Sequence, residues 1–227
     1  MASSSSSNFE LGAILGSVAT IVLYYIVLFY RIRIAKDYSI QMNKNMRSMK
    51  AWAKRHLEKQ DAASVQLGVQ ALRNTIFVAI FVGGFAINLA YSFLDTLHTS
   101  NFTGFSDVLW MKDVRSLILI VLLFCSFLNW AAVLRYACEL AFIIDSNVEA
   151  SNSCPMEETE KVVWLSRTTE LSVLMTLHFT FGLRFMYISI PFAFMSAGPI
   201  ALIIATVLII LFHVDHDFNR YKIDKQS

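Results

Sequence analysis

Five apolar runs, each long enough to cross a bilayer, constrain this chain more than any other feature. The apolar core of a bilayer needs about 20 helical residues, since each adds ~1.5 Å. The runs cover residues 11–30, 75–94, 116–140, 171–195 and 199–214. We therefore expect an all-α, multi-pass transmembrane bundle of about five spans, with residues 11–218 forming one membrane domain. Four spans would remain if the run at 171–195 were only partly inserted.

The two ends of the chain are polar. The first ten residues, MASSSSSNFE, contain no Lys or Arg, and no small-residue cleavage site follows the first apolar run. This pattern argues against a cleaved signal peptide and against a transit peptide. We expect residues 1–10 to be a disordered tail ahead of a retained membrane anchor, and residues 219–227 to be a polar tail.

Composition and motifs disfavour the common soluble enzymes. The chain is 56% hydrophobic and 16% charged, whereas soluble domains are roughly a quarter charged. It has no phosphate-binding loop, nucleophile elbow or zinc-protease motif. The stretch FHVDHD, Phe212–Asp217, places histidines near one another without a third metal ligand, so we interpret it as the polar end of the last span. We expect no enzymatic activity, no cofactor, no bound metal and no nucleic-acid partner.

The distribution of Lys and Arg predicts the orientation. Residues 31–74 hold ten of them, residues 95–115 two, residues 145–170 two and the tail after residue 214 three. An orientation with the N-terminus outside or luminal and the C-terminus cytosolic places 15 of these inside and 2 outside. Asn101, in the sequon NFT, then lies outside, where it could be glycosylated, although such triplets also occur by chance.

The segment between the first two spans predicts a basic amphipathic helix at about residues 41–72. Apolar side chains recur at three- and four-residue steps, with Trp52 at the edge of their face. The opposite side carries Lys44, Arg47, Lys54 and Arg55. Such a helix lies among anionic lipid headgroups. The alternative is that it packs against other cytosolic parts of the protein or a second subunit.

Polar residues form a stripe on each of two spans. On the fourth span they are Thr176, Thr180, Arg184, Tyr187 and Pro191. On the third they are Asn129, Arg135, Tyr136 and Glu139, beside Ala132. Polar stripes within a membrane are expected to face each other or water and not lipid.

Arg184 needs a partner, because a charge at the bilayer centre costs ~2.5–3.5 kcal/mol or more. Glu139 is our candidate for that partner, as the acidic residue farthest inside an apolar run. The competing interpretation pairs Glu139 with Arg135, one helical turn earlier, and places Arg135 among the inner headgroups.

Two stretches resemble an uncharacterised family, domain of unknown function 599. They are GVQALRNTIFVAIFVGGFAI and GLRFMYISIPFAFMSAGPIALIIATVLIILFHVDHDF, which resemble a helix entry and the last hairpin of that family. The resemblance covers about residues 43–218 and implies a multi-pass membrane protein. The residues that carry it are Gln70, Arg73, Asn74, Gly182, Arg184, Tyr187, Pro191, Gly198, Pro199 and Asp217. The chain departs from the family pattern at RYACE, after Arg135, and at Leu183.

Two functions fit these features. The first is a homo-oligomeric channel or transporter for a small solute, anionic if Arg184 faces the pathway. The second is a non-enzymatic scaffold or assembly factor, in which Arg184 is a structural clasp and the basic helix binds lipid. A lipid-modifying enzyme built on FHVDHD is the least favoured interpretation.

Overall fold

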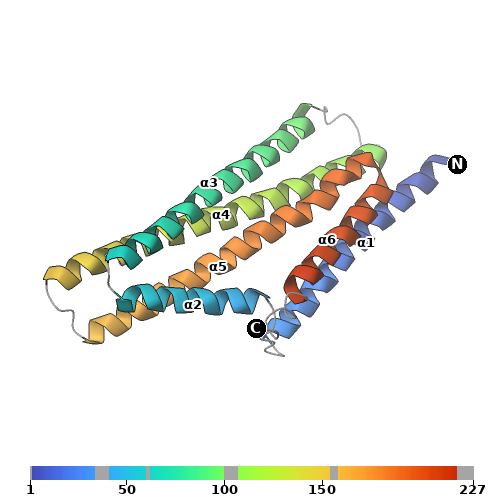
Figure 1. Ribbon diagram of the computed structural model, residues 1–227. Helices are drawn as coiled ribbons and strands as arrows, with labels where there is room; N and C mark the ends of the chain where they lie inside the picture. The colour runs from blue at the N-terminus through green and yellow to red at the C-terminus, as the bar shows by residue number, and fades with distance from the viewer. Residues whose placement is uncertain (1, 34–40, 60–61, 100–106, 154–157, 219–227) are drawn as a thin grey trace. The chain divides into compact units, whose positions relative to one another are not determined.

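The computed structural model describes residues 2–33, 41–59, 62–99, 107–153 and 158–218, and these segments are almost entirely helical (Figure 1). No strand occurs within them. The helices are α1 (Ala2–Arg33), α2 (Gln41–Lys59), α3 (Ala62–Thr99), α4 (Asp107–Ser153), α5 (Glu158–Phe194) and α6 (Pro199–Phe218). A short 3-10 turn, η1 (Met195–Ala197), lies between the last two.

Five of these helices contain segments that are long and apolar enough to span a membrane. The segments are Asn8–Ile32, Val65–Asp95, Ser116–Asp145, Val162–Phe194 and Pro199–Phe218. The five runs expected from the sequence all lie on these helices, so the all-α, multi-pass membrane fold is confirmed.

The helix ends correct two expectations. Residues 1–10 were expected to be a disordered tail, but α1 begins at Ala2 and includes the Ser-rich stretch, since extending an existing helix is far easier than starting one. The helix expected at about 41–72 is instead divided: α2 ends at Lys59 and α3 begins at Ala62. Val65 and Leu72, seven residues apart on one face of α3, are both buried, so this stretch packs as part of the spanning helix.

Some predictions cannot be compared with the structure. The polar tail at 219–227 and the sequon at Asn101 lie outside the described residues.

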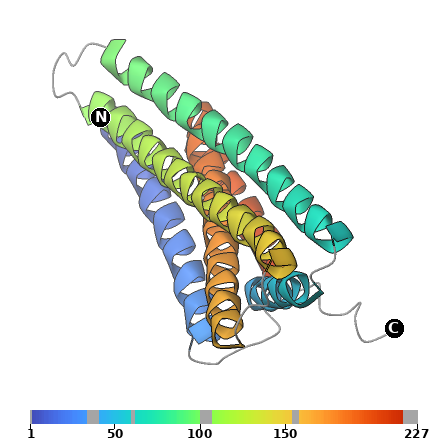
Figure 2. The ribbon, with the colours of Figure 1, turned by 90° about the vertical axis from the view of Figure 1, so that its left-hand side faces the viewer.

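The chain divides into two compact units. Unit 1 comprises Met1–Asn43, Ala86–Ser126 and Leu183–Ser227, and unit 2 comprises Lys44–Phe85 and Phe127–Gly182. Four helices, α2, α3, α4 and α5, contribute residues to both units. Helix α4 has 47 residues, contributes to both units and is drawn in Figure 2 as an unbroken ribbon.

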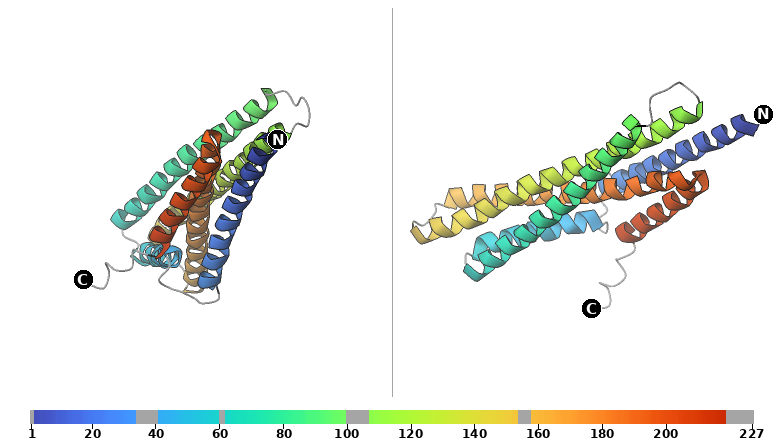
Figure 3. Two further views of the ribbon diagram at one scale, coloured as in Figure 1. Left: turned by 90° about the vertical axis from the view of Figure 1, so that its right-hand side faces the viewer. Right: turned by 90° about the horizontal axis from the view of Figure 1, so that it is seen from above.

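In unit 1, the end of α5 turns back into α6 through η1 (Figure 3). Gly198 has a φ of 116°, which residues with a Cβ rarely adopt, and its N–H donates to the carbonyl of Met195 at 2.9 Å. Pro199 then begins α6, where its missing N–H costs no helical hydrogen bond. The hairpin predicted from Ser196–Pro199 is confirmed.

Helix α6 also lies against α1, as Figure 1 shows. The residues of α6 that are buried recur every four or seven positions and therefore share a face: Leu202, Thr206, His213 and Asp217. Most of this face is polar, in a helix whose other sides are aliphatic as far as Leu211. A polar face in a membrane helix requires partners within the protein.

In unit 2, Trp130 of α4 forms the centre of the packing and is 1% exposed. Its ring meets that of Phe179 edge-on, with centroids 5.0 Å apart. A Cβ added to Gly83 on α3 would lie 3.0 Å from Trp130 Cβ, and one added to Gly182 on α5 would lie 3.0 Å from its Nε1. The indole thus fits between two helices because both present glycine.

Candidate functional site

A buried ion pair lies in unit 1. Arg184 Nη2 donates to both carboxylate oxygens of Asp217, at 2.7 and 2.8 Å. The Arg184 and Asp217 side chains are only 7% and 2% exposed. The hairpin between α5 and α6 brings the two together, and each charge neutralises the other.

The prediction that Arg184 pairs with Glu139 is therefore wrong. Glu139 instead accepts from Arg167 Nη2 at 2.5 Å, in unit 2, and it does not take the alternative partner Arg135. The error arose because the last apolar run was taken to end at residue 214. Helix α6 continues to Phe218 and carries Asp217 on its buried face, so an acidic residue expected near the interface is the partner.

Helix α1 adds two tyrosines to this ion pair. The Tyr24 hydroxyl donates to Asp217 Oδ2, and the Tyr25 ring lies 5.7 Å from Arg184 Cζ, within cation–π range. Sequence reasoning had not singled out either residue. The only signal was a pair of adjacent hydroxyl-bearing rings inside the first apolar run.

His213 of α6 lies beside the pair and is 5% exposed. Its Nδ1 is 2.8 Å from the carbonyl oxygen of Ile209, and since a carbonyl can only accept, Nδ1 carries the proton. The neutral ring then has Nε2 as an acceptor, whereas a protonated ring has it as a donor. The rings of Tyr24 and Tyr187 approach His213 edge-on, with centroids 6.0 and 5.8 Å away.

Three buried polar atoms in this region lack a hydrogen-bond partner among the described residues: Tyr25 Oη, Arg184 Nη1 and His213 Nε2. Together with the residues that surround them they form what we call the Arg184 cluster: Tyr24, Tyr25, Arg184, His213 and Asp217. Buried polar atoms are nearly always hydrogen-bonded, to protein, water or ligand. The Tyr25 hydroxyl lies within hydrogen-bonding reach of Arg184, so these atoms are candidates to bind one another or a small polar species.

The stripe predicted on the fourth span divides between two roles. Thr176 and Thr180 donate to carbonyl oxygens of their own helix, at 2.8 and 2.9 Å. The Tyr187 ring contacts the His213 ring edge-on. Pro191 is buried inside α5, and because it has no N–H, the Tyr187 carbonyl lacks its usual helical donor. Only the second half of the stripe lies with the charged residues.

The stripe predicted on the third span belongs to unit 2. Asn129 Oδ1 is 2.9 Å from His178 Nδ1, and the Tyr136 ring lies 5.6 Å from the His178 ring. Asn129 and His178 thus satisfy one another across α4 and α5. Arg135 is exposed.

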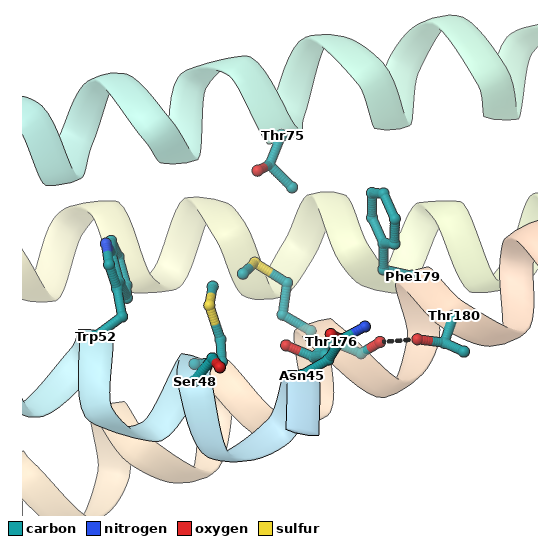
Figure 4. Close-up of a pocket in the computed structure, with 9 residues that line it drawn as sticks. Asn45, Ser48, Trp52, Thr75, Thr176, Phe179 and Thr180 are labelled. Carbon is teal, nitrogen blue, oxygen red and sulfur yellow. Dashed lines mark hydrogen bonds between the residues drawn. The ribbon is translucent and has the colours of Figure 1, made fainter. Parts of the chain in front are cut away.

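Unit 2 also contains an open groove of about 460 Å³ (Figure 4). Its lining residues come from α2, α3 and α5: Asn45, Ser48, Met49, Trp52, Thr75, Met175, Thr176, Phe179 and Thr180. Ala53 of α2 is fully buried, while Arg47, Lys54 and Arg55 are exposed. Part of the apolar face of α2 thus packs on protein, and its contact with lipid stays a prediction.

The residues that carried the family resemblance lie in several places. Gln70, Arg73 and Asn74 are exposed on α3. Gly182 approaches Trp130, and Gly198 and Pro199 make the α5–α6 turn. Asp217, by contrast, is the partner of Arg184. The pattern therefore contains both residues of the buried ion pair.

The family described as "Protein of unknown function, DUF599" matches residues 13–221, and the chain belongs to this family. The match includes every residue of the Arg184 cluster and of the groove. No curated protein and no solved structure matches the chain. The protein is an integral membrane protein.

Proposed function

We propose that this family member transports a small anionic solute, as a non-enzymatic homo-oligomer, with the Arg184 cluster as its polar binding site. The observation that carries the proposal is the group of unsatisfied polar atoms around a buried ion pair. Intramembrane charges are costly, and those of transport proteins lie along the path of the substrate or proton.

The cluster supplies the donors that an anion needs. Arg184 Nη1 and the Tyr25 hydroxyl can each donate a hydrogen bond without giving up an existing one among the described residues. Arg184 is already neutralised by Asp217, so an added anion would give the site a net negative charge. Protonation of His213 Nε2 would restore neutrality and add a third donor.

The proposal therefore includes coupling of anion entry to a proton. The charged or titratable groups that the described residues place beside His213 are Tyr24 from α1, Arg184 and Tyr187 from α5, and His216 and Asp217 from α6. In this scheme the anion and the proton enter together, and the ion pair is retained.

Vesicle swelling measured by light scattering tests the transport proposal. Purified protein in liposomes would be exposed to potassium salts of chloride, nitrate, phosphate and acetate, with an ionophore that exchanges potassium for protons, so that potassium enters as the imported proton leaves. We expect swelling with at least one anion, faster with the external side acidic. Arg184→Gln should abolish it, while Arg167→Gln, the same change in the exposed pair, should not. Absence of protein-dependent swelling with all four salts counts against the proposal.

The second candidate is a scaffold in which the cluster is a structural clasp. It is favoured by the fact that Arg184, Asp217 and Tyr24 tie together three helices, α5, α6 and α1. The charge-free pair Arg184→Leu with Asp217→Leu separates the two functions. Transport is supported if the double variant folds but its liposomes no longer swell. The clasp is supported if the double variant is unstable and the unmodified protein also gives no swelling.

Orientation is part of the same proposal, with the N-terminus outside or luminal and the C-terminus cytosolic. The ten Lys and Arg residues at 31–74 support it. Single cysteines at Lys50 and at Asn101 should be labelled by an impermeant maleimide from opposite sides of the membrane. Labelling of both from one side would reject the orientation.

A further inference from the structure

We propose that the groove between α2, α3 and α5 binds one anionic phospholipid, with an acyl chain along its apolar wall and the phosphate at the basic edge of α2. The groove lies wholly in unit 2. The proposal is therefore independent of the transport function proposed for the Arg184 cluster.

The lining of the groove suits one lipid chain. Its volume of about 460 Å³ falls within the ~300–1,000 Å³ of typical ligand pockets. Met49 and Met175 are flexible side chains that adapt to a flexible ligand, and Trp52 is a residue type enriched at the membrane boundary. Figure 4 shows Thr75 projecting from α3 toward the residues of α2 and α5, so the groove also has a polar side.

The position of the groove along the spans also suits a lipid. Thr75 and Thr176 lie 10 and 14 residues after the first residues of the candidate spans Val65–Asp95 and Val162–Phe194, in the first half of each span. The second and fourth spans enter the bilayer from the same side, because spans alternate in direction. The groove therefore lies in the half of the bilayer from which both spans enter, which is the depth of one phospholipid acyl chain.

Charge on α2 selects an anionic headgroup. The helix has six Lys and Arg residues against one acidic residue. At 100° per residue, Lys44 and Arg55 fall on the same edge of α2 as the groove residue Ser48, while Arg47 and Lys54 fall on the far side. A phosphate at the Ser48 edge would thus be near two cationic side chains.

The hydroxyl groups of the groove indicate which kind of anionic headgroup fits. Thr75 and Thr176 already donate to carbonyl oxygens of their own helices, at 3.1 and 2.8 Å, so they can only accept further hydrogen bonds. An accepting oxygen is complementary to a headgroup that has hydroxyl groups of its own. Phosphatidylglycerol, which combines a negative phosphate with a hydroxyl-bearing headgroup, is therefore the probe of choice.

Native mass spectrometry of the full-length protein tests the proposal. The protein would be released from micelles containing phosphatidylglycerol and phosphatidylcholine with identical chains. We expect one phosphatidylglycerol per chain, and the double variant Lys44→Gln with Arg55→Gln should weaken its binding about twenty-five-fold, since each basic residue near an anionic surface contributes about fivefold. The matched control, Arg47→Gln with Lys54→Gln, removes the same charge from the far side and should change binding by less than about threefold. Equal losses in the two variants would show general surface attraction and overturn the proposal.

Filling the groove gives an independent readout. Ser48→Phe, at an exposed position, and Thr75→Phe, from another wall, should each remove the bound lipid whatever its headgroup. Melting temperature and elution volume identify any Phe variant that has not folded. If neither Phe variant folds, the charge variants decide whether the groove binds the lipid. If a folded Phe variant still bound phosphatidylglycerol, the groove would be excluded as the lipid-binding site. Equal retention of phosphatidylcholine would exclude the basic edge, and a shift from oligomer to monomer in the Phe variants would identify a second copy as the occupant.

Discussion

Each unit contains an arginine–carboxylate ion pair, and the two pairs differ mainly in exposure. In unit 1 the Arg184 and Asp217 side chains are 7% and 2% exposed, and one guanidinium nitrogen contacts both carboxylate oxygens. In unit 2 the Arg167 and Glu139 side chains are 62% and 29% exposed and share a single contact. The same two chemical groups thus occur in two environments within one protein.

The difference in exposure determines how much stability is lost when one partner of each ion pair is removed. Exposed ion pairs contribute little, because solvent already stabilises both charges. A buried pair brings little net stability either, but losing one partner leaves an uncompensated buried charge. Arg184 and Asp217 therefore depend on each other far more than Arg167 and Glu139 do.

The largest expected effect follows from breaking the buried pair. Arg184→Leu leaves Asp217 buried with the Tyr24 hydroxyl as its hydrogen-bond donor and His216 Nδ1 3.6 Å away, and we expect the free energy of unfolding to fall by ~3–5 kcal/mol. Denaturation in mild detergent, followed by circular dichroism, would measure the loss.

The charge-free variant Arg184→Leu with Asp217→Leu is the control. It should recover most of the loss, because apolar replacement of a whole buried pair is often neutral or stabilising. Purely additive losses in the double-mutant cycle would contradict the pairing.

The next effect concerns packing in unit 2. Gly182→Ala would place a Cβ 3.0 Å from Trp130 Nε1, and this overpacking should cost ~1–3 kcal/mol. Gly84→Ala is the matched control, since a Cβ there meets nothing within 4 Å and alanine favours a helix by up to ~1 kcal/mol. The difference in melting temperature between the two variants measures the cost of overpacking. A Gly182→Ala protein as stable as Gly84→Ala would mean that the helices do not need this close approach.

The spans could be predicted because they depend only on local composition. Length and apolarity place a helix in a bilayer wherever its neighbours lie, so the five runs and the Ser196–Pro199 turn were readable in the sequence. The tight approach at Trp130 was not, because which glycine meets which ring depends on how three helices pack.

The partner of Arg184 shows where sequence reasoning failed and what could have helped. Hydropathy ranked Glu139 first because it lies deeper in an apolar run than Asp217 does. The buried residues of α6, at positions 202, 206, 213 and 217, nevertheless follow a strict helical spacing. Polar residues at that spacing signal a buried face even at the end of a span. Tyr24 gave no such signal, since hydroxyl-bearing rings are common in membrane helices.

A smaller effect is expected where both partners are uncharged. Asn129 and His178 share one hydrogen bond in unit 2, at 2.9 Å. Side-chain hydrogen bonds between membrane helices contribute ~0.6 kcal/mol on average in double-mutant cycles. We expect a coupling free energy of about that size between Asn129→Ala and His178→Ala. A coupling several times larger would show that neutral polar groups in unit 2 depend on one another as the buried charges of unit 1 do.

The smallest effect is expected for the exposed pair. Arg167 is 62% exposed and contacts Glu139 through one nitrogen, without the two-pronged geometry that strengthens such pairs. Arg167→Gln and Glu139→Gln should therefore show a coupling free energy of ~0.2–1 kcal/mol. Because exposed charges are screened by ions, with a Debye length of ~3 Å at 1 M salt, the coupling should vanish at that concentration. The Arg184–Asp217 coupling should survive the same salt, since ions cannot approach a pair that is 7% and 2% exposed. If high salt weakened both couplings alike, the buried pair would have to be reached by water and ions, and its exposure could no longer account for the difference between the two units.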